Sequence, residues 1–351
     1  MLRKKDNLVG LDIGSHAVKM IRVKERNAKL RLVNLGLAPV PRDAFSEGRL
    51  TKPDLIGGSI QRLASHLKMK EKATATSISG YEVMIKKIEL PTMTEEELHN
   101  RMHVELGQYI PYNIEEVEVD YQVMDIVKDR PTHMEVLLVA AKKDSINDCI
   151  SLVKLSGLDP FVVDVDFFAL SNAYEATYGL TGDESVLLLD IGAGKATMNI
   201  ISRGVPVFTR DIPIGGYQIT DRIKEHFRVS TEEAERMKLS EASDESRHEE
   251  LQEIFVAVVG NWVSEIKRAI DFFHNNYPGN DVKRVLLSGG SCRIPGLDKL
   301  LEENLHSEVE LFNPLARMDY DPKVFDPAYV DYIGPQMAIS LGLALRKTSE
   351  K

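Results

Sequence analysis

A short pattern occurs twice in this chain, once near the N-terminus and again near the midpoint. Residues 8–23 read LVGLDIGSHAVKMIRV, and residues 186–201 read VLLLDIGAGKATMNII. Each copy has an apolar run, the tripeptide Asp-Ile-Gly, a few small or polar residues and a second strand-like run. Two such runs joined by a short glycine-containing turn are typical of a β-hairpin. The repeat therefore predicts an α/β chain built from two related halves.

The two predicted turns have the composition of a phosphate site. A strand that ends in Asp-x-Gly and enters a tight turn can present successive backbone N–H groups to phosphate. A carboxylate there can hold hydrated magnesium, which prefers one or two carboxylates plus phosphate oxygens. Either hairpin alone could be an ordinary turn. As a pair they predict a metal shared by Asp12 and Asp190, with phosphates lined by Gly14, Ser15, Gly192 and Gly194 and neutralised by Lys19.

Composition excludes several classes of protein. The chain of 351 residues has 44 Lys+Arg and 54 Asp+Glu, a formal charge of −10. Binding to a phosphate backbone requires a broad basic surface, so nucleic acid is not an expected partner. Two cysteines, Cys149 and Cys292, are too few for a disulfide framework and lack metal-ligand spacing. We expect two reduced, buried thiols.

Targeting signals are also not expected. The N-terminal sequence MLRKKDNLVGLDIG is basic, but Asp12 interrupts its apolar stretch before a signal peptide could form. No segment approaches the ~20 apolar residues that span a bilayer. The sequence predicts a cytoplasmic protein.

Residues 80–157 have the pattern of a separate module, strand–helix–strand–strand–helix. Thr94, followed three residues later by Glu97, is typical of a helix N-cap with its capping box. That helix should end before Pro111, and the last helix of the module should end at Gly157. Strands are expected at 117–127 and 134–141.

In the second half, apolar residues at helical spacing predict a long helix from Leu251 to Phe273. The polar stretch 240–250 before it is expected to be a solvated loop. A short strand at 285–287 leads into Ser-Gly-Gly-Ser, where glycines would let the backbone pack flat against a nucleobase, or would form a plain connection. A final helix is expected over 333–345.

In this order the segments resemble the five nucleotide-binding motifs of the actin superfamily. Residues 212–238 are similar to the cell-division homologue FtsA, and residues 80–91 and 104–123 are very like the PilM family of type IV pilus assembly proteins. The resemblance covers essentially the whole chain. The five motifs match residues 12–23, 163–174, 186–201, 285–301 and 334–345.

The resemblance implies an actin-like, ribonuclease H-like fold of two duplicated lobes, 1–165 and 166–351, with an SHS2-type subdomain inserted at about 80–157. It implies ATP and Mg²⁺ as ligands. Glu235 and Lys238 would reach the ribose and base. The remaining residues assigned to the nucleotide by this resemblance are Gly215 and Gly216 near the phosphates, and Gly289, Gly290 and Ser291 along the adenosine. Lys195, which lies in the second phosphate turn, is also predicted to contact the nucleotide.

The chain departs from the superfamily pattern at two places. Lys195-Ala196 stands where the second phosphate motif usually has a hydroxyl residue, with Thr197 further on. The first connecting helix begins Asp166-Phe167 instead of Glu-Pro. Asp166 could orient an attacking water, but a helix N-cap is the favoured role. We expect at most a weak ATPase.

The family resemblance also implies partners. In PilM-like proteins a cleft beside the SHS2 module receives the short cytoplasmic N-terminal peptide of PilN, an inner-membrane protein. This chain would then lie at the inner face of the membrane through protein partners, and other pilus components or self-association remain open.

Two alternative functions are weighed against this one. An FtsA-like membrane tether would end in an amphipathic helix, which the tail RKTSEK does not provide. A small-molecule kinase would need an aspartate base aimed at a hydroxyl, and Asp166 is the one residue that fits.

Overall fold

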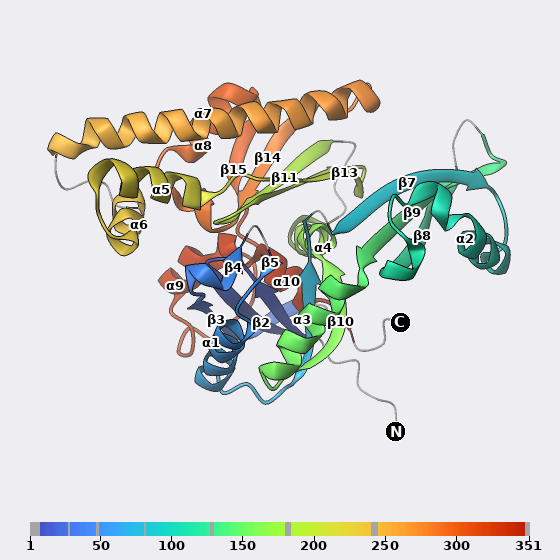
Figure 1. Cartoon of the computed structure of the whole chain (residues 1–351), viewed down its shortest axis with the longest axis horizontal. Coiled ribbons are helices and arrows are strands. Elements are labelled where there is room, and N and C mark those ends of the chain that lie inside the picture. Colours follow the sequence, from blue (N-terminus) through green and yellow to red (C-terminus); the bar gives the residue numbers. More distant parts are fainter. Residues whose placement is uncertain are drawn as a thin grey trace. The chain divides into compact units, whose positions relative to one another are not determined.

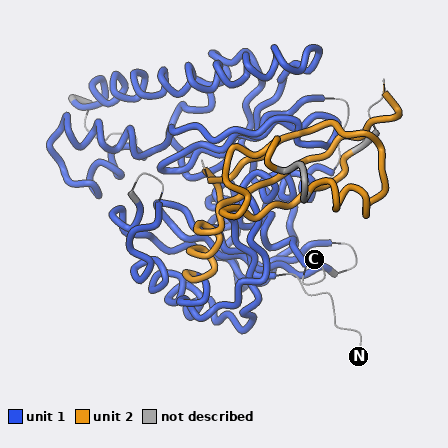
Figure 2. The backbone as a smooth tube through the Cα atoms, turned by 45° about the vertical axis from the view of Figure 1, so that its right-hand side comes forward, with its two compact units in different colours: residues 1–77, 153–351 blue, residues 78–152 orange. Residues whose placement is uncertain are grey.

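The structure is a computed structural model that describes residues 8–26, 29–46, 49–80, 82–126, 130–179, 184–239 and 245–347. The chain divides into two compact units, shown in different colours in Figure 2. Unit 1 contains residues 1–77 and 153–351, and unit 2 contains residues 78–152. Each unit is described by itself.

Unit 1 contains two five-stranded sheets with the same topology (Figure 1). The strand orders are β10-β6-β1-β2-β3 and β13-β12-β11-β14-β15. In each sheet the central strand, β1 or β11, pairs antiparallel with the next strand of the chain and parallel with its other neighbour. The predicted relation between the two halves is confirmed. The strands are β1 (Val9–Ile13), β2 (Ala17–Arg26), β3 (Lys29–Pro39), β6 (Ala73–Ile78), β10 (Asp159–Val165), β11 (Ser185–Ile191), β12 (Ala196–Ser202), β13 (Val205–Ile212), β14 (Val282–Ser288) and β15 (Glu308–Leu311).

The second sheet is buried on both faces. Leu187 and Leu189 of β11 pack in one cluster with helices that include the long α7, whereas Val186 and Leu188 pack in another with α4 and α10. Strands covered on both faces have near-continuous apolar sequences, as β11 does. Helices in this unit are α1 (Pro53–His66), α4 (Asp166–Tyr178), α5 (Gly216–Phe227), α6 (Thr231–Leu239), α7 (Glu245–Asn276), α8 (Leu297–Leu305), α9 (Pro327–Ile333) and α10 (Ala338–Ala344).

Helices α4 and α10 cross at very close range. A Cβ atom on Gly342 of α10 would lie 1.7 Å from the carbonyl oxygen of Ala169 in α4. A Cβ on Gly10 of β1 would lie 2.0 Å from the carbonyl oxygen of Ser340. Glycine is required at both positions because neighbouring backbone occupies the space. These contacts fix the β1 strand, and the turn that follows it, against α10.

Short elements complete unit 1. The 3₁₀ turns are η1 (Arg42–Ala44), η3 (Gly290–Arg293) and η4 (Gly334–Met337), and β4 (Phe45–Ser46) pairs with β5 (Arg49–Leu50).

Unit 2 is a three-stranded antiparallel sheet with helices. Its strand order is β7-β9-β8, with β7 at Val83–Pro91, β8 at Val117–Ile126 and β9 at His133–Lys142. The helices are α2 (Glu95–Tyr109), the 3₁₀ turn η2 (Ile114–Glu116) and α3 (Lys143–Leu155), whose last residues belong to unit 1. The predicted capping box is confirmed. The backbone N–H of Thr94 donates to the Glu97 carboxylate at 2.9 Å, and the N–H of Glu97 donates to Thr94 Oγ1 at 3.3 Å.

Some predicted elements differ from the structure. Residues 245–250 were expected in a loop but form the first turns of α7, because the helix continues past its apolar stripe into a solvated end. The single helix expected over 333–345 begins as the 3₁₀ turn η4, which contains Gly334 and Pro335, and continues as α10, while α9 ends at Ile333. Parts of several predicted segments lie outside the described residues. These parts are 1–7 of the N-terminal stretch, 127 at the end of a predicted strand, 240–244 of the predicted loop and 348–351 of the tail. None of the helices in the described residues has the length and hydropathy of a membrane span.

Candidate functional site

The two Asp-Ile-Gly turns have the same backbone hydrogen bond. The N–H of Gly14 donates to the carbonyl of Ala17 at 3.1 Å, and the N–H of Gly192 donates to the carbonyl of Lys195 at 2.9 Å. The cross-strand register also corresponds, because Asp12 faces Lys19 and Asp190 faces Thr197. Both predicted β-hairpins are therefore confirmed, and each places its aspartate at the end of a central strand.

The two turns lie against each other although their sequences are far apart. A Cβ on Gly194 would lie 3.2 Å from Ser15 Oγ. The start of α5 joins the second turn, since the N–H of Gly216 donates to the carbonyl of Gly192 at 3.1 Å. Ser291 Oγ donates to the same carbonyl at 2.8 Å. Glycines and serines from four segments of the chain therefore meet in one place.

The carboxylates of the two turns share one electrostatic environment. Lys19 Nζ donates to Asp12 Oδ2 at 2.7 Å, and Asp12 is only 7% exposed. Ser288 Oγ donates to Asp190 Oδ2 at 2.8 Å. Burial raises the pKa of Asp190 to about 6, with the charge on Asp12 adding to this rise while Lys19 and Ser288 oppose it. Burial lowers the pKa of Lys19, but the charges on Asp12 and Asp190 outweigh it, so the net shift is upward.

Lys195 connects the second turn to other acidic side chains. Its Nζ lies 3.0 Å from Asp166 Oδ2 and 3.2 Å from Asp211 Oδ2. Burial opposes its charge, yet these two carboxylates raise the pKa of Lys195 overall. Ser77 Oγ donates to the other oxygen of Asp166 at 2.6 Å. Both oxygens of Asp166 therefore accept hydrogen bonds from the protein.

The N-cap role predicted for Asp166 is wrong. Val165 occupies the cap position of α4, and Asp166 is the first helical residue. Its side chain is oriented by Ser77 and Lys195, two residues from distant segments, and the local helix-start pattern does not reveal such partners.

A second group of residues surrounds the start of α5. Lys238 Nζ lies 2.7 Å from Glu235 Oε2 and 3.0 Å from Thr220 Oγ1. A Cβ on Gly216 would lie 2.7 Å from Ser291 Oγ and 3.3 Å from Lys238 Nζ. Four of the residues expected at the nucleotide are thus brought together here, and Thr220 joins them without having been predicted.

The remaining glycines are explained by close backbone approach. Gly215 would place a Cβ 2.4 Å from the carbonyl oxygen of Ala193. Gly289 has φ +87° and would place a Cβ 2.4 Å from the carbonyl oxygen of Ile191. Gly290 follows it as the first residue of η3. Ser288, Ser77 and Asp211 were not predicted, although Ser288 directly precedes the glycine pair.

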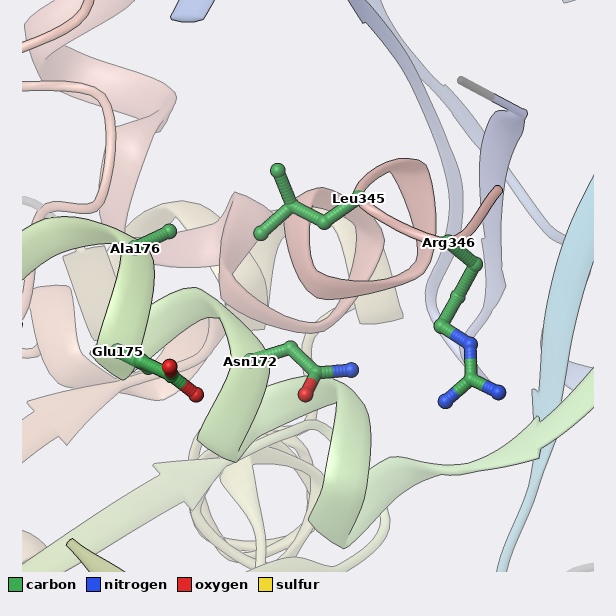
Figure 3. A pocket seen from close by; sticks show the side chains of 5 residues that line it. All are labelled: Asn172, Glu175, Ala176, Leu345 and Arg346. Atoms are coloured by element: carbon green, nitrogen blue, oxygen red, sulfur yellow. The ribbon is translucent and has the colours of Figure 1, made fainter. Parts of the chain in front are cut away.

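A separate pocket of about 410 Å³ lies beside α4 and the end of α10 (Figure 3). None of the residues predicted for the nucleotide lines it. Its lining residues are Asn172, Glu175, Ala176, Leu345 and Arg346. Within the described residues, no group of three or more histidine, cysteine, aspartate or glutamate side chains is arranged to hold a metal ion. The two turns offer the carboxylates of Asp12 and Asp190, which suits magnesium because it prefers one or two carboxylates together with waters and phosphate oxygens.

Comparisons with known proteins agree with this geometry. The family model described as type IV pilus assembly protein PilM matches residues 10–348. The chain belongs to the PilM family. A solved structure described as a PilM-PilN type IV pilus biogenesis complex is similar over 99% of this chain and all of that chain, with 26% identity and a TM-score of 0.86. The actin-like fold and the assignment to type IV pilus assembly are thereby confirmed.

More distant relatives belong to the same superfamily. The chain is 24% identical to the cell division protein FtsA of Bacillus subtilis, over 93% of this chain and 82% of that protein. It is also 24% identical to FtsA of Pseudomonas aeruginosa, over 93% of this chain and 88% of that protein. A structure of the ethanolamine utilization protein EutJ from Carboxydothermus hydrogenoformans, 16% identical over 97% of this chain and 90% of that chain, shares the fold with a TM-score of 0.55. Actin-like ATPases as a superfamily bind nucleotides, generally with Mg²⁺.

Proposed function

We propose that this PilM-family chain binds Mg²⁺-ATP against its two Asp-Ile-Gly turns and uses the bound nucleotide to bias its conformation during type IV pilus assembly. The observation that supports this most is the contact between the turns. Ser15 lies beside Gly194, and the charges of Asp12 and Asp190 act on each other. Backbone N–H groups from both halves can thus reach the phosphates of one nucleotide.

The charge of the site suits a divalent cation. Four carboxylates interact with two ammonium groups, which leaves a formal charge of −2. We assign Asp12 and Asp190 to a hydrated Mg²⁺, which would supply positive charge that neutralises these carboxylates and the phosphates. The other members of the set are Asp166, Asp211, Lys19 and Lys195.

The remaining residues divide between phosphate and nucleoside. Gly14, Ser15, Gly192 and Gly194 provide the turns, and Lys19 neutralises phosphate charge when ATP is bound. We assign Gly215 and Gly216 to the vicinity of the phosphates. The set proposed for the nucleoside is Glu235, Lys238, Gly289, Gly290 and Ser291.

We infer that turnover of ATP is slow. A carboxylate that orients an attacking water needs an oxygen available to accept its hydrogen bond. Ser77 and Lys195 each donate to one oxygen of Asp166, which uses part of its acceptor capacity, and the positive charge of Lys195 weakens it as a base. Binding of nucleotide, rather than its consumption, would then be the functional event.

We also propose that the chain binds the N-terminal cytoplasmic peptide of a PilN-type membrane protein. The similar solved structure, a PilM-PilN complex, supports this partner. Such a peptide would hold the chain at the inner face of the membrane, with no membrane-spanning helix of its own needed.

Two binding measurements test the proposal. Titration calorimetry of the purified protein with ATP should give binding in the micromolar range that depends on Mg²⁺, and fluorescence anisotropy with a labelled N-terminal peptide of the PilN from the same genome should give a Kd of the same order. A scrambled peptide is the control. Absence of ATP binding would refute the proposed nucleotide site. Equal binding of the PilN peptide and the scrambled peptide would refute the proposed partner.

A further inference from the structure

One group of contacts in unit 1 is not explained by the nucleotide motifs. The guanidinium of Arg42, in η1, bonds to the carboxylate of Asp221 in α5 and lies over the ring of Tyr217, 4.3 Å from its centroid. The Tyr217 hydroxyl donates to the carbonyl of Ser15 at 3.0 Å. The Tyr217 ring also meets the His16 ring edge-on, with centroids 6.0 Å apart. Three kinds of contact therefore join η1 and the first turn to α5.

Tyr217 touches both turns at once. Its backbone N–H donates to the carbonyl of Ala193 in the second turn at 2.9 Å, while its hydroxyl bonds to Ser15 in the first. It directly follows Gly216, which contacts Ser291 and Lys238. The turns can therefore move apart only if Tyr217 gives up one of these two hydrogen bonds, and the side-chain bond to Ser15 is the one that does not belong to the backbone around α5.

Arg42 holds Tyr217 in this position. A cation over an aromatic face and an ion pair each restrict the ring and the helix that carries it. The side chains of Arg42 and Asp221 are 36% and 45% exposed, so solvent ions reach this pair. The ion pair should weaken with salt, whereas the hydroxyl bond at Ser15 should respond less.

We propose that Arg42, Tyr217 and Asp221 form a latch that keeps the two turns closed on bound nucleotide and sets the rate at which nucleotide leaves. The proposal rests on the nucleotide site proposed above and adds its regulation. A partner or a solution condition that separates Arg42 from Asp221 would speed nucleotide exchange without touching the nucleotide.

Release of a fluorescent ATP analogue, mant-ATP with Mg²⁺, tests the latch by stopped flow. Arg42→Ala and Asp221→Ala should each release the analogue about three- to tenfold faster, and the charge-swapped double variant R42D/D221R should recover part of the wild-type rate. Tyr217→Phe removes the hydroxyl alone and should also speed release. Added salt should speed release from wild type and have less effect on Arg42→Ala.

The matched control is Arg222→Ala, which removes a neighbouring arginine of α5 whose side chain is 69% exposed and pairs with Glu225. It should leave the release rate unchanged. Equal release rates for wild type, Arg42→Ala and Tyr217→Phe would overturn the latch.

A second readout separates the latch from the nucleotide site. Amide hydrogen exchange over residues 14–17, measured without nucleotide, should be faster in Arg42→Ala and Tyr217→Phe than in wild type. If the wild-type protein bound no nucleotide, the proposed function would fail. Amide hydrogen exchange would then be the one test of whether Arg42 and Tyr217 hold the turns together. Faster exchange would support it, and unchanged exchange would overturn it.

Discussion

The first and second phosphate turns share the same backbone hydrogen bond but differ in the arrangement of their charged side chains. In both, a glycine N–H closes the turn on the carbonyl three residues later. In the first turn, the residue facing the aspartate across the hairpin is Lys19, which pairs with Asp12. In the second turn that place is taken by Thr197, and the lysine stands two residues earlier, at 195.

The shifted lysine changes what each aspartate experiences. Lys195 extends to Asp166 and Asp211, while Asp190 accepts a hydrogen bond from the Ser288 hydroxyl. Burial raises the pKa of Asp190 to about 6, and burial also raises the pKa of Asp12, although the Lys19 ammonium bonded to Asp12 opposes that rise. The two halves therefore share the hairpin that presents backbone amides, but the lysine of each hairpin pairs with different carboxylates. We expect the two turns to respond differently to the same substitution.

The largest difference should appear in folding stability when each aspartate is changed to asparagine. Asp190→Asn removes a buried charge whose pKa is raised in the fold, so it should stabilise the protein at pH 7.5 by about 1–2 kcal/mol. Burial also raises the pKa of Asp12, but Asp12→Asn leaves the buried Lys19 ammonium without its ion-pair partner, so this variant should destabilise the protein by about 1–2 kcal/mol. Urea unfolding without nucleotide measures both. A loss of stability in both variants would contradict the comparison.

A smaller effect is expected at Lys195. Lys195→Met leaves Asp166 and Asp211 without the ammonium between them and should lower the free energy of unfolding by about 1 kcal/mol, because the side chain is 37% exposed and solvent screens the pair. The same urea experiment measures it. Asp211→Asn in the Lys195→Met background should restore part of the loss by removing one of the two charges. No restoration would mean that the charges do not interact as the structure places them.

The smallest expected effect is a pH dependence of Mg²⁺-ATP binding. The folded-state pKa of Asp190 is about 6, above its usual 3.8. The stability that its protonation contributes is fully present below pH 3.8 and is lost as pH rises through 6, while metal binding needs the ionised form. Affinity should therefore fall about fourfold from pH 7.5 to 5.5, and Asp190→Asn should lose this step. Calorimetry at both pH values measures it, and an unchanged slope in the variant would assign the pH dependence to another group.

Local patterns in the sequence predicted most of the fold. Alternation and glycine placement located both hairpins, and Thr94 with Glu97 located the start of α2, because these signals act over a few residues. The 3₁₀ turn η4 at the start of the helix expected over 333–345 was missed, because Gly334 and Pro335 do not interrupt the apolar pattern there.

The parts of the site that could not be predicted depend on long-range contacts. Asp166 is oriented by Ser77, and Arg42 is paired with Asp221, across large separations in sequence. No spacing rule marks such pairs before the chain is folded. The motif residues themselves could be named from the sequence, since glycines that permit close backbone approach stand beside characteristic strands.

The central claim is that the aspartates of the two turns act on one cation. The most direct test is the Mg²⁺-dependent affinity for ATP of Asp12→Asn, Asp190→Asn and the double variant, measured by calorimetry at pH 7.5. We predict that each single variant loses about tenfold or more, and that the double variant loses far less than the product of the two because both act through the same ion. Unchanged affinity in both single variants would contradict the account.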